Sequence, residues 1–116
     1  MSIFEKRGWP NARVKFQTLT EQMYYILLCL HRECYGMDIM DQIPAMTGGR
    51  VKVGSGTLYH LLEQFLAAGM IRQTKAEGRR RCYILTDKGR QTLEEEYRRL
   101  RAQAADFRRV FGEEDP

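Results

Sequence analysis

The last quarter of the 116-residue chain carries an apolar repeat of the kind that joins two helices. Six apolar residues recur alternately four and three positions apart, as in the heptads of a coiled coil. They are Leu93, Tyr97, Leu100, Ala104, Phe107 and Phe111. Charged residues fill the positions between them, so a helix over 87–111, roughly 38 Å long, has an apolar seam and a solvated face. A second copy of the chain is the expected cover for this seam, and packing within one chain is the alternative.

A second apolar segment, Met23–Leu30, is expected to form the first clear helix, and a buried strand is the alternative. Thr20 is the predicted N-cap, and Thr18 with Glu21 also fits a capping box. A helix that is apolar on all sides needs cover on all sides, and one small domain covers one face. We therefore expect a second chain to cover the other face, with Tyr24 in the interface.

Two more helices are predicted in the middle of the chain. One begins at Tyr35-Gly36, and Pro44 is expected to end or bend it. Val51–Val53 is expected to form a short strand. The next helix follows Gly54 and stops at Gly69. Its expected core stripe is Leu58, Leu61, Leu62, Phe65 and Leu66.

A β-hairpin is predicted after the third helix. The segments Met70–Lys75 and Arg79–Leu85 flank a glycine-containing loop at 76–78, and Thr86 is expected to cap the last helix. Helix, helix, helix, hairpin, helix is the order of a winged helix-turn-helix domain. The predicted fold is therefore mainly α with a small β-hairpin. Its parts are an N-terminal arm at 1–17, a winged helix-turn-helix domain at 18–86, a C-terminal dimerisation helix at 87–112 and an acidic tail at 113–116.

The positive charge of the chain is concentrated in the hairpin. Residues 72–81 hold five basic residues against Glu77, so their net charge of +4 equals that of the whole chain. Arg79, Arg80 and Arg81 are consecutive, and alternate residues of a strand project to both sides of the ribbon. Such a hairpin can grip a phosphate backbone or insert an arginine into a narrow minor groove. A merely solvated charged surface is the alternative.

The third helix has a polar side opposite its leucine stripe, centred on Gly56, His60 and Ala67. Near its N-terminus, Ser55, Gly56 and Thr57 offer hydroxyl and backbone N–H groups to phosphate. His60 and Gln64 are the candidates for contacts with base edges. An ordinary solvated helix face is the alternative, and the neighbouring arginines favour nucleic acid.

Other classes of protein find little support. Cys29, Cys34 and Cys82 have no paired spacing, and with no secretory or membrane-spanning segment apparent, a reducing cytoplasm is the expected location. Cys29, His31 and Cys34 lack a fourth ligand at a standard spacing, so we expect a buried structural thiol and no metal. No catalytic constellation and no cofactor motif is found, so the chain is not expected to be an enzyme.

Four segments together resemble the PadR family of transcriptional regulators. They are Leu19–Leu28, Tyr35-Gly36, Gly54–Tyr59 and Arg79–Gly89. The resemblance covers roughly residues 18 to 100. It implies a winged-helix repressor with one long C-terminal dimerisation helix.

The resemblance also assigns residues to DNA. It implies that Tyr35, Thr57, Tyr59 and the wing arginines approach the duplex, with Leu58 in the core. Ser55 and Pro44 depart from the family pattern in ways that bear on docking. The third helix has no basic residue and carries Glu63, so phosphate affinity is expected from Lys52, the wing and the arm. The full set expected at DNA is Tyr35, Lys52, Ser55, Gly56, Thr57, Tyr59, His60, Gln64, Lys75, Arg79, Arg80 and Arg81.

Members of this family often respond to small aromatic compounds. The resemblance therefore suggests a ligand pocket involving Trp9, Tyr25, Tyr97 and Phe107, with Tyr24 nearby. A plain aromatic dimer interface is the alternative. The protein is therefore expected to be a sequence-specific transcriptional regulator that binds double-stranded DNA as a homodimer. It is expected to act as a repressor that responds to a ligand. A winged-helix module that binds only protein is the competing hypothesis.

Overall fold

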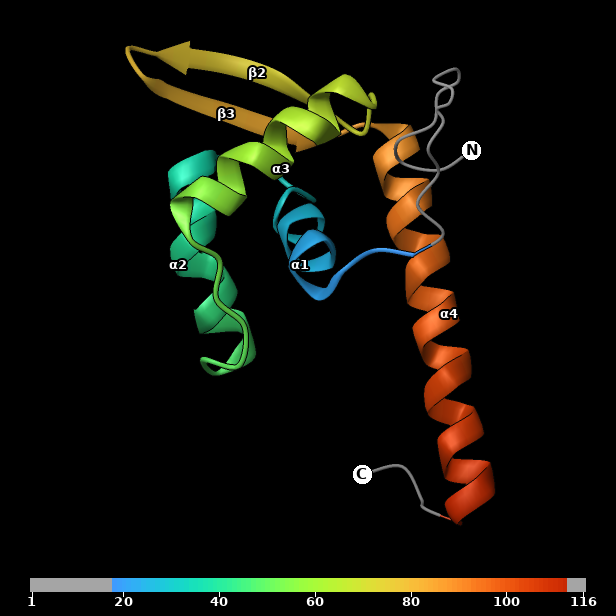
Figure 1. The fold of residues 1–116 in the computed structure, drawn as a ribbon. Helices are drawn as coiled ribbons and strands as arrows, with labels where there is room; N and C mark the ends of the chain where they lie inside the picture. Colours follow the sequence, from blue (N-terminus) through green and yellow to red (C-terminus); the bar gives the residue numbers. More distant parts are fainter. Residues whose placement is uncertain (1–17, 113–116) are drawn as a thin grey trace.

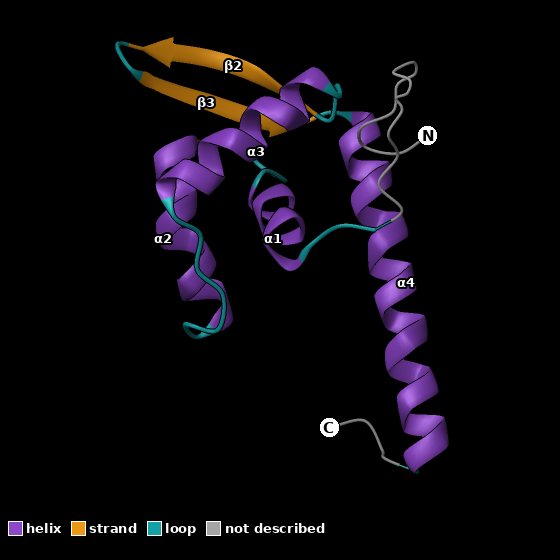
Figure 2. Ribbon diagram, viewed as in Figure 1, coloured by secondary structure: helices purple, strands orange, loops and turns teal. Residues whose placement is uncertain are grey.

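Four helices and a three-stranded antiparallel sheet make up residues 18–112, the part of the chain that the computed structural model describes (Figures 1 and 2). The elements in order are α1 (Glu21–Cys29), β1 (Cys34–Tyr35), α2 (Gly36–Thr47), α3 (Ser55–Ala67), β2 (Ile71–Glu77), β3 (Arg80–Leu85) and α4 (Asp87–Phe111). The predicted arm at 1–17 and acidic tail at 113–116 lie outside the described residues. The fold is the predicted one, mainly helical with a hairpin and a long last helix.

Local hydrogen bonds explain where α1 and α4 begin. The Met23 amide donates to Thr20 Oγ1 at 3.1 Å, so Thr20 is the predicted N-cap. Its capping-box partner is the Met23 sulfur, which accepts from the Thr20 amide at 3.5 Å. Thr18 with Glu21 is therefore not the box that forms. Thr86 caps α4 in the same way, accepting from the Gly89 amide at 3.1 Å.

We call α1, α2, α3 and the sheet together the head (residues 18–86), and α1 lies between α2 and α4 in Figure 1. Ile26, Leu27 and Leu30 are fully buried, and they pack in one core with Leu58 and Phe65 of α3. The upper part of α4 from the same chain lies against α1, so this chain itself supplies part of the cover that was expected from a second copy.

The third strand of the sheet differs from the prediction. Val51–Val53 is not a strand; both valines are buried in the core, in the loop before α3. The third strand is β1, whose Cys34 and Tyr35 pair with Tyr83 and Cys82 of β3. A two-residue strand has no periodicity of its own, so only its partner could reveal it.

Pro44 does not end α2, which continues to Thr47. Proline removes only one amide donor, and the last turn is closed by other bonds. Thr47 Oγ1 donates to the Ile43 carbonyl at 2.9 Å. The Gly49 amide donates to the Pro44 carbonyl at 2.8 Å.

The predicted burial of two helix residues was also wrong. Leu66, expected in the core stripe of α3, is 36% exposed, whereas the other four members of that stripe are buried. Glu96, expected on the solvated face of α4, is buried against α1 and receives a bond from Arg99 Nε at 3.0 Å. Burying a carboxylate is tolerable here because the guanidinium pairs with it through two nitrogens.

The start of α4 is bonded to residues 68–70, the segment that directly follows α3. Thr86 donates from its amide to the Met70 carbonyl at 3.0 Å and from its hydroxyl to the Gly69 carbonyl at 2.6 Å. Lys88 Nζ donates to the Ala68 carbonyl at 2.7 Å. A Cβ added at Gly89 would lie 2.0 Å from the Met70 oxygen, so α4 rests directly on the backbone that leaves α3. The two helices therefore form one rigid joint.

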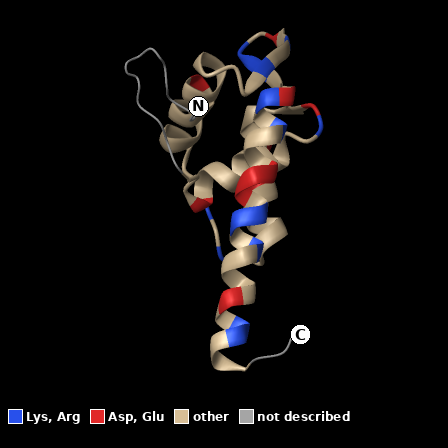
Figure 3. Cartoon of the chain, turned by 90° about the vertical axis from the view of Figure 1, so that its right-hand side faces the viewer, with Lys and Arg blue, Asp and Glu red and all other residues tan. Residues whose placement is uncertain are grey.

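Beyond this joint α4 leaves the head as a single rod (Figure 1). Segments coloured for basic and for acidic residues alternate along the ribbon of α4 in Figure 3. None of the helices within 18–112 is long and apolar enough to cross a membrane.

The Gly89→Ala variant tests the joint. It is expected to lose about 2–3 kcal/mol of unfolding free energy, because the methyl group must separate α4 from the Met70 carbonyl. Urea unfolding followed by circular dichroism measures this. Gly56→Ala is the control, since nothing lies within 4 Å of a Cβ there, and it should keep or gain up to about 1 kcal/mol. Equal stability of the two variants would contradict the close approach.

Candidate nucleic-acid interface

The N-terminal turn of α3 is open to solvent. Ser55, Gly56, Thr57, Tyr59 and His60 are exposed, whereas Leu58 between them is fully buried, as predicted. Gly54 caps the helix without a side-chain hydrogen bond. The first amides of a helix have no partner inside it, so those of α3 are positioned to bind an anion.

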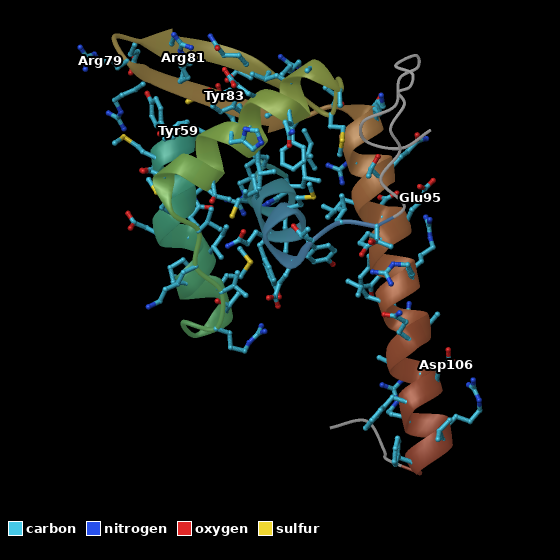
Figure 4. All side chains as sticks on the ribbon, viewed as in Figure 1. Tyr59, Arg79, Arg81, Tyr83, Glu95 and Asp106 are labelled. Carbon is cyan, nitrogen blue, oxygen red and sulfur yellow. The ribbon has the colours of Figure 1, made fainter. Side chains whose placement is uncertain are left out.

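The wing is the hairpin of β2 and β3, which extends over α3 (Figure 1). Its strands are joined by Gly78 and Arg79, and Gly78 has a φ of 61°, as a two-residue turn requires at its first position. Arg79 therefore stands at the tip, with Arg80 and Arg81 entering β3 (Figure 4). All three arginines are exposed, as is Lys75 on β2.

Two hollows separate the wing from the helices. One, of about 370 Å³, is lined by Tyr35, Gly36, Met37, Tyr59, Arg79, Arg80, Arg81 and Tyr83. The other, of about 400 Å³, is lined by Tyr59, His60, Leu62, Glu63, Leu66, Arg81 and Tyr83. Tyr59, Arg81 and Tyr83 line both, so the hollows adjoin one another between α3 and the wing (Figure 4). We call these two adjoining hollows together the wing groove.

Gly36 explains how Tyr59 is held in the wing groove. A Cβ at Gly36 would lie 3.3 Å from Cε1 of Tyr59 and 3.3 Å from Cδ1 of Leu62, closer than side chains ordinarily pack. The start of α2 is therefore packed directly against α3. Because Tyr35 immediately precedes Gly36, the same contact places both tyrosines in one hollow.

Tyr35 is engaged by two wing side chains. Its hydroxyl donates to Oε1 of Glu77 at 2.7 Å, and the guanidinium carbon of Arg80 lies 4.0 Å from the centre of its ring. The hydrogen bond to Glu77, followed by desolvation, raises the pKa of the Tyr35 phenol to about 12. Tyr35 therefore stays protonated and able to donate at neutral pH.

The structure brings together only part of the predicted DNA-binding set. Of that set, the wing groove gathers Tyr35, Tyr59, His60, Arg79, Arg80 and Arg81. Lys52 is exposed on the loop before α3, and Gln64 is half-buried farther along the helix. Sequence reasoning missed the contacts of Tyr83 and Glu77 with this site. The signal for Glu77 is its position opposite Arg80 across the turn, which is known only once the hairpin register is known.

Within the single described chain, the residues of the predicted ligand pocket do not line one cavity. Tyr25 lines a cavity of about 210 Å³ between α1 and α4, with Tyr24, Glu96 and Arg99 also in its wall. Tyr97 and Phe107 do not line it; they are exposed on α4, about 15 Å apart along the helix axis. Trp9 lies outside the described residues.

The apolar seam of α4 is partly exposed. Leu93, expected there, is only 8% exposed and belongs to the head core, because the joint turns this part of α4 inward. Farther along, Tyr97 and Phe107 are each 49% exposed and Phe111 is 70% exposed. The rings of Phe107 and Phe111 lie 4.7 Å apart, and Leu100 and Ala104 are exposed beside them. Val110, missed by the heptad reasoning, adds to this surface.

All three cysteines are free thiols, and two of them are buried. Cys29 and Cys82 are buried, and burial raises the pKa of the Cys29 thiol to about 11, so it is protonated and unreactive at neutral pH. No cluster of three or more potential metal ligands occurs within residues 18–112.

Comparison with solved structures gives the same fold. A transcriptional regulator from Clostridium thermocellum matches with a TM-score of 0.66 and 19% identity, over 79% of this chain and 97% of that one. A PadR-like transcription factor from Bacteroides fragilis matches with a TM-score of 0.64 and 26% identity, over 77% and 88%. PadR from Bacillus subtilis, solved in complex with operator DNA, matches with a TM-score of 0.56 and 28% identity, over 65% and 45%. No curated protein sequence matches.

The family model of the transcriptional regulator PadR-like family matches residues 26–95. That range is more than half of the chain and includes α2, α3, the wing and the joint with α4. The predicted resemblance is confirmed. The chain belongs to the PadR-like family of transcriptional regulators, which are winged-helix DNA-binding proteins and not enzymes.

Proposed function

We propose that this protein is a repressor that binds an operator as a homodimer, with α3 in the major groove and the wing on the flanking backbone. The observation that carries the proposal is the wing groove, which places Tyr59 and His60 of α3 beside Arg79–Arg81 on one face. Bacillus subtilis PadR in complex with operator DNA shares this fold, which supports the same mode of docking. Occupation of an operator by such a dimer would block transcription.

The contacts divide into two kinds. Phosphate is met by the first amides of α3, by Lys52 and Lys75, and by the wing arginines, all on exposed elements. Base edges are met by Tyr59 and His60, which are exposed one turn into α3. Gln64 lies farther along the helix and is half-buried, so its reach toward a base edge is the shortest of the three.

A second copy of the chain is the proposed cover for the exposed seam of α4. Three aromatic side chains, each 49–70% exposed and gathered on one stripe of a helix, are unusual on the surface of a soluble protein and typical of an interface. A two-fold dimer would present two α3 helices to successive turns of the duplex.

The wing is tested by removing two of its charges. Arg79→Ala/Arg81→Ala is expected to weaken binding to the DNA upstream of the gene about 10- to 100-fold, and to reduce the salt slope by roughly 2. Arg98→Ala/Arg109→Ala removes the same charge from exposed positions of α4 and should change affinity less than about threefold. Fluorescence anisotropy across a salt series measures both. Equal losses in the two variants would show that net charge acts, and not the wing.

We further propose that a small aromatic effector binds the cavity between α1 and α4. Its volume of about 210 Å³ lies below the usual range for drug-sized ligands and suits a single ring. Tyr24 and Tyr25 supply aromatic walls, with their rings 5.5 Å apart and nearly perpendicular. Because α4 carries the proposed dimer seam and is joined to the segment after α3, a ligand that displaces α4 from α1 would also change the spacing of the two α3 helices in the dimer.

Phenol, benzoate and 4-hydroxybenzoate are suitable probes of this cavity. At least one of them is expected to raise the thermal midpoint of the free protein and to release it from DNA. Tyr25→Ala should remove the thermal shift, whereas Tyr59→Ala, which alters the wing groove instead, should keep it. A panel without any thermal shift in the wild-type protein would reject a single-ring effector.

A further inference from the structure

The wing carries one acidic side chain among its five basic ones, and that side chain faces inward to a tyrosine. Glu77 ends β2 and lies opposite Arg80 across the turn. Its carboxylate accepts the hydroxyl proton of Tyr35 at 2.7 Å. Arg80 covers the ring of Tyr35 at 4.0 Å. Each strand of the sheet thus contributes one member to a Tyr35–Glu77–Arg80 cluster.

The chemistry of this cluster resembles that of a bound phosphate. An anionic oxygen acceptor is held by a phenol donor beside a guanidinium, as a phosphate of the DNA backbone would be. A phenol has one proton to donate. While Glu77 accepts it, Tyr35 offers only lone pairs to an approaching phosphate, whose oxygens also only accept. Tyr35 therefore cannot donate to DNA until Glu77 releases it.

The cluster stands at the wing groove. Tyr35 and Arg80 both line the hollow of about 370 Å³, together with Arg79 and Arg81. A phosphate entering this hollow meets the three arginines, but it also meets the negative field of Glu77 close by. The carboxylate also lowers the net positive charge of the wing. The wing therefore neutralises fewer phosphates and releases fewer of the counterions condensed on DNA.

We propose that Glu77 competes with backbone phosphate for the Tyr35 hydroxyl. The carboxylate weakens binding of the wing to DNA until this hydroxyl donates to a phosphate of the duplex instead. The inference rests on the proposed function, since it requires the wing to meet phosphate. It makes Glu77 an affinity-setting residue that contacts Tyr35 and does not itself bind DNA. A purely structural role, in which Glu77 only latches the wing to β1, predicts no gain in affinity when the carboxylate is replaced by an amide.

The Glu77→Gln variant separates the two roles. The amide oxygen of glutamine still accepts from Tyr35, so the latch is kept while the negative charge is removed. Glu95→Gln is the matched control, because Glu95 is exposed on α4, far from the wing (Figure 4). Circular dichroism and thermal unfolding establish that both variants are folded.

The measurement is the affinity of each protein for a mixed-sequence duplex of about 30 base pairs at several salt concentrations, which requires no knowledge of the operator. Glu77→Gln is expected to bind about 3- to 10-fold more tightly than wild type at low salt, with a salt slope steeper by up to about 1. Glu95→Gln should stay within about twofold of wild type. Adding Tyr35→Phe to Glu77→Gln should remove part of the gain, because the hydroxyl, which a neutral amide holds less strongly than a carboxylate and yields more easily to phosphate, is then absent.

Two failures are distinguishable. If wild type binds the duplex and Glu77→Gln binds equally or more weakly, Glu77 is only a latch and this inference is overturned while the proposed function stands. If neither wild type nor Glu77→Gln binds the duplex even at low salt, the proposed function fails and the inference fails with it.

Discussion

At the junction of α3 and α4 the backbone of Gly89 lies so close to Met70 that an added Cβ would be 2.0 Å from its carbonyl oxygen. Hydrogen bonds from Thr86 and Lys88 to the carbonyls of residues 68–70, directly after α3, surround this contact. The proposed recognition helix and the proposed dimerisation helix therefore move as one body. Because of this joint, a displacement of α4 at the proposed dimer seam would also displace α3. The proposed regulation by a ligand between α1 and α4 depends on it.

Sequence patterns predicted the features that have long periods or strong local chemistry. The order of helices and hairpin, the full extent of α4 and the caps at Thr20 and Thr86 follow from periodicity and from hydroxyl side chains at helix starts. The open N-terminal turn of α3 with Leu58 turned inward also follows, because a helix of known phase exposes known positions. The wing arginines were predictable because a glycine separates two extended segments. The loop expected at 76–78 is instead the two-residue turn Gly78-Arg79, since Ala76 and Glu77 pair with β3 and belong to β2.

The remaining features depend on which element packs on which. The heptad assigned Leu93 to the seam, but the Gly89 joint turns that part of α4 toward the core. β1 forms only because β3 lies beside it. Glu96 is buried only because α1 lies beside this part of α4. Likewise, the bond between Glu77 and Tyr35 joins residues 42 positions apart and cannot be read from either neighbourhood.

The central claim is that the seam of α4 joins two copies of the chain. It is tested most directly by measuring the mass of the protein in solution together with its footprint on the DNA upstream of its gene. Sedimentation should give twice the chain mass of 13.6 kDa, and hydroxyl-radical footprinting should show two protected segments centred about 34–36 Å apart. Phe107→Lys, on the exposed seam, should sediment as a single chain and lose the paired footprint. Ala102→Lys, on the outward face of α4, should behave as wild type. A wild-type protein that sediments as one chain and protects one segment, unchanged by Phe107→Lys, would contradict the account.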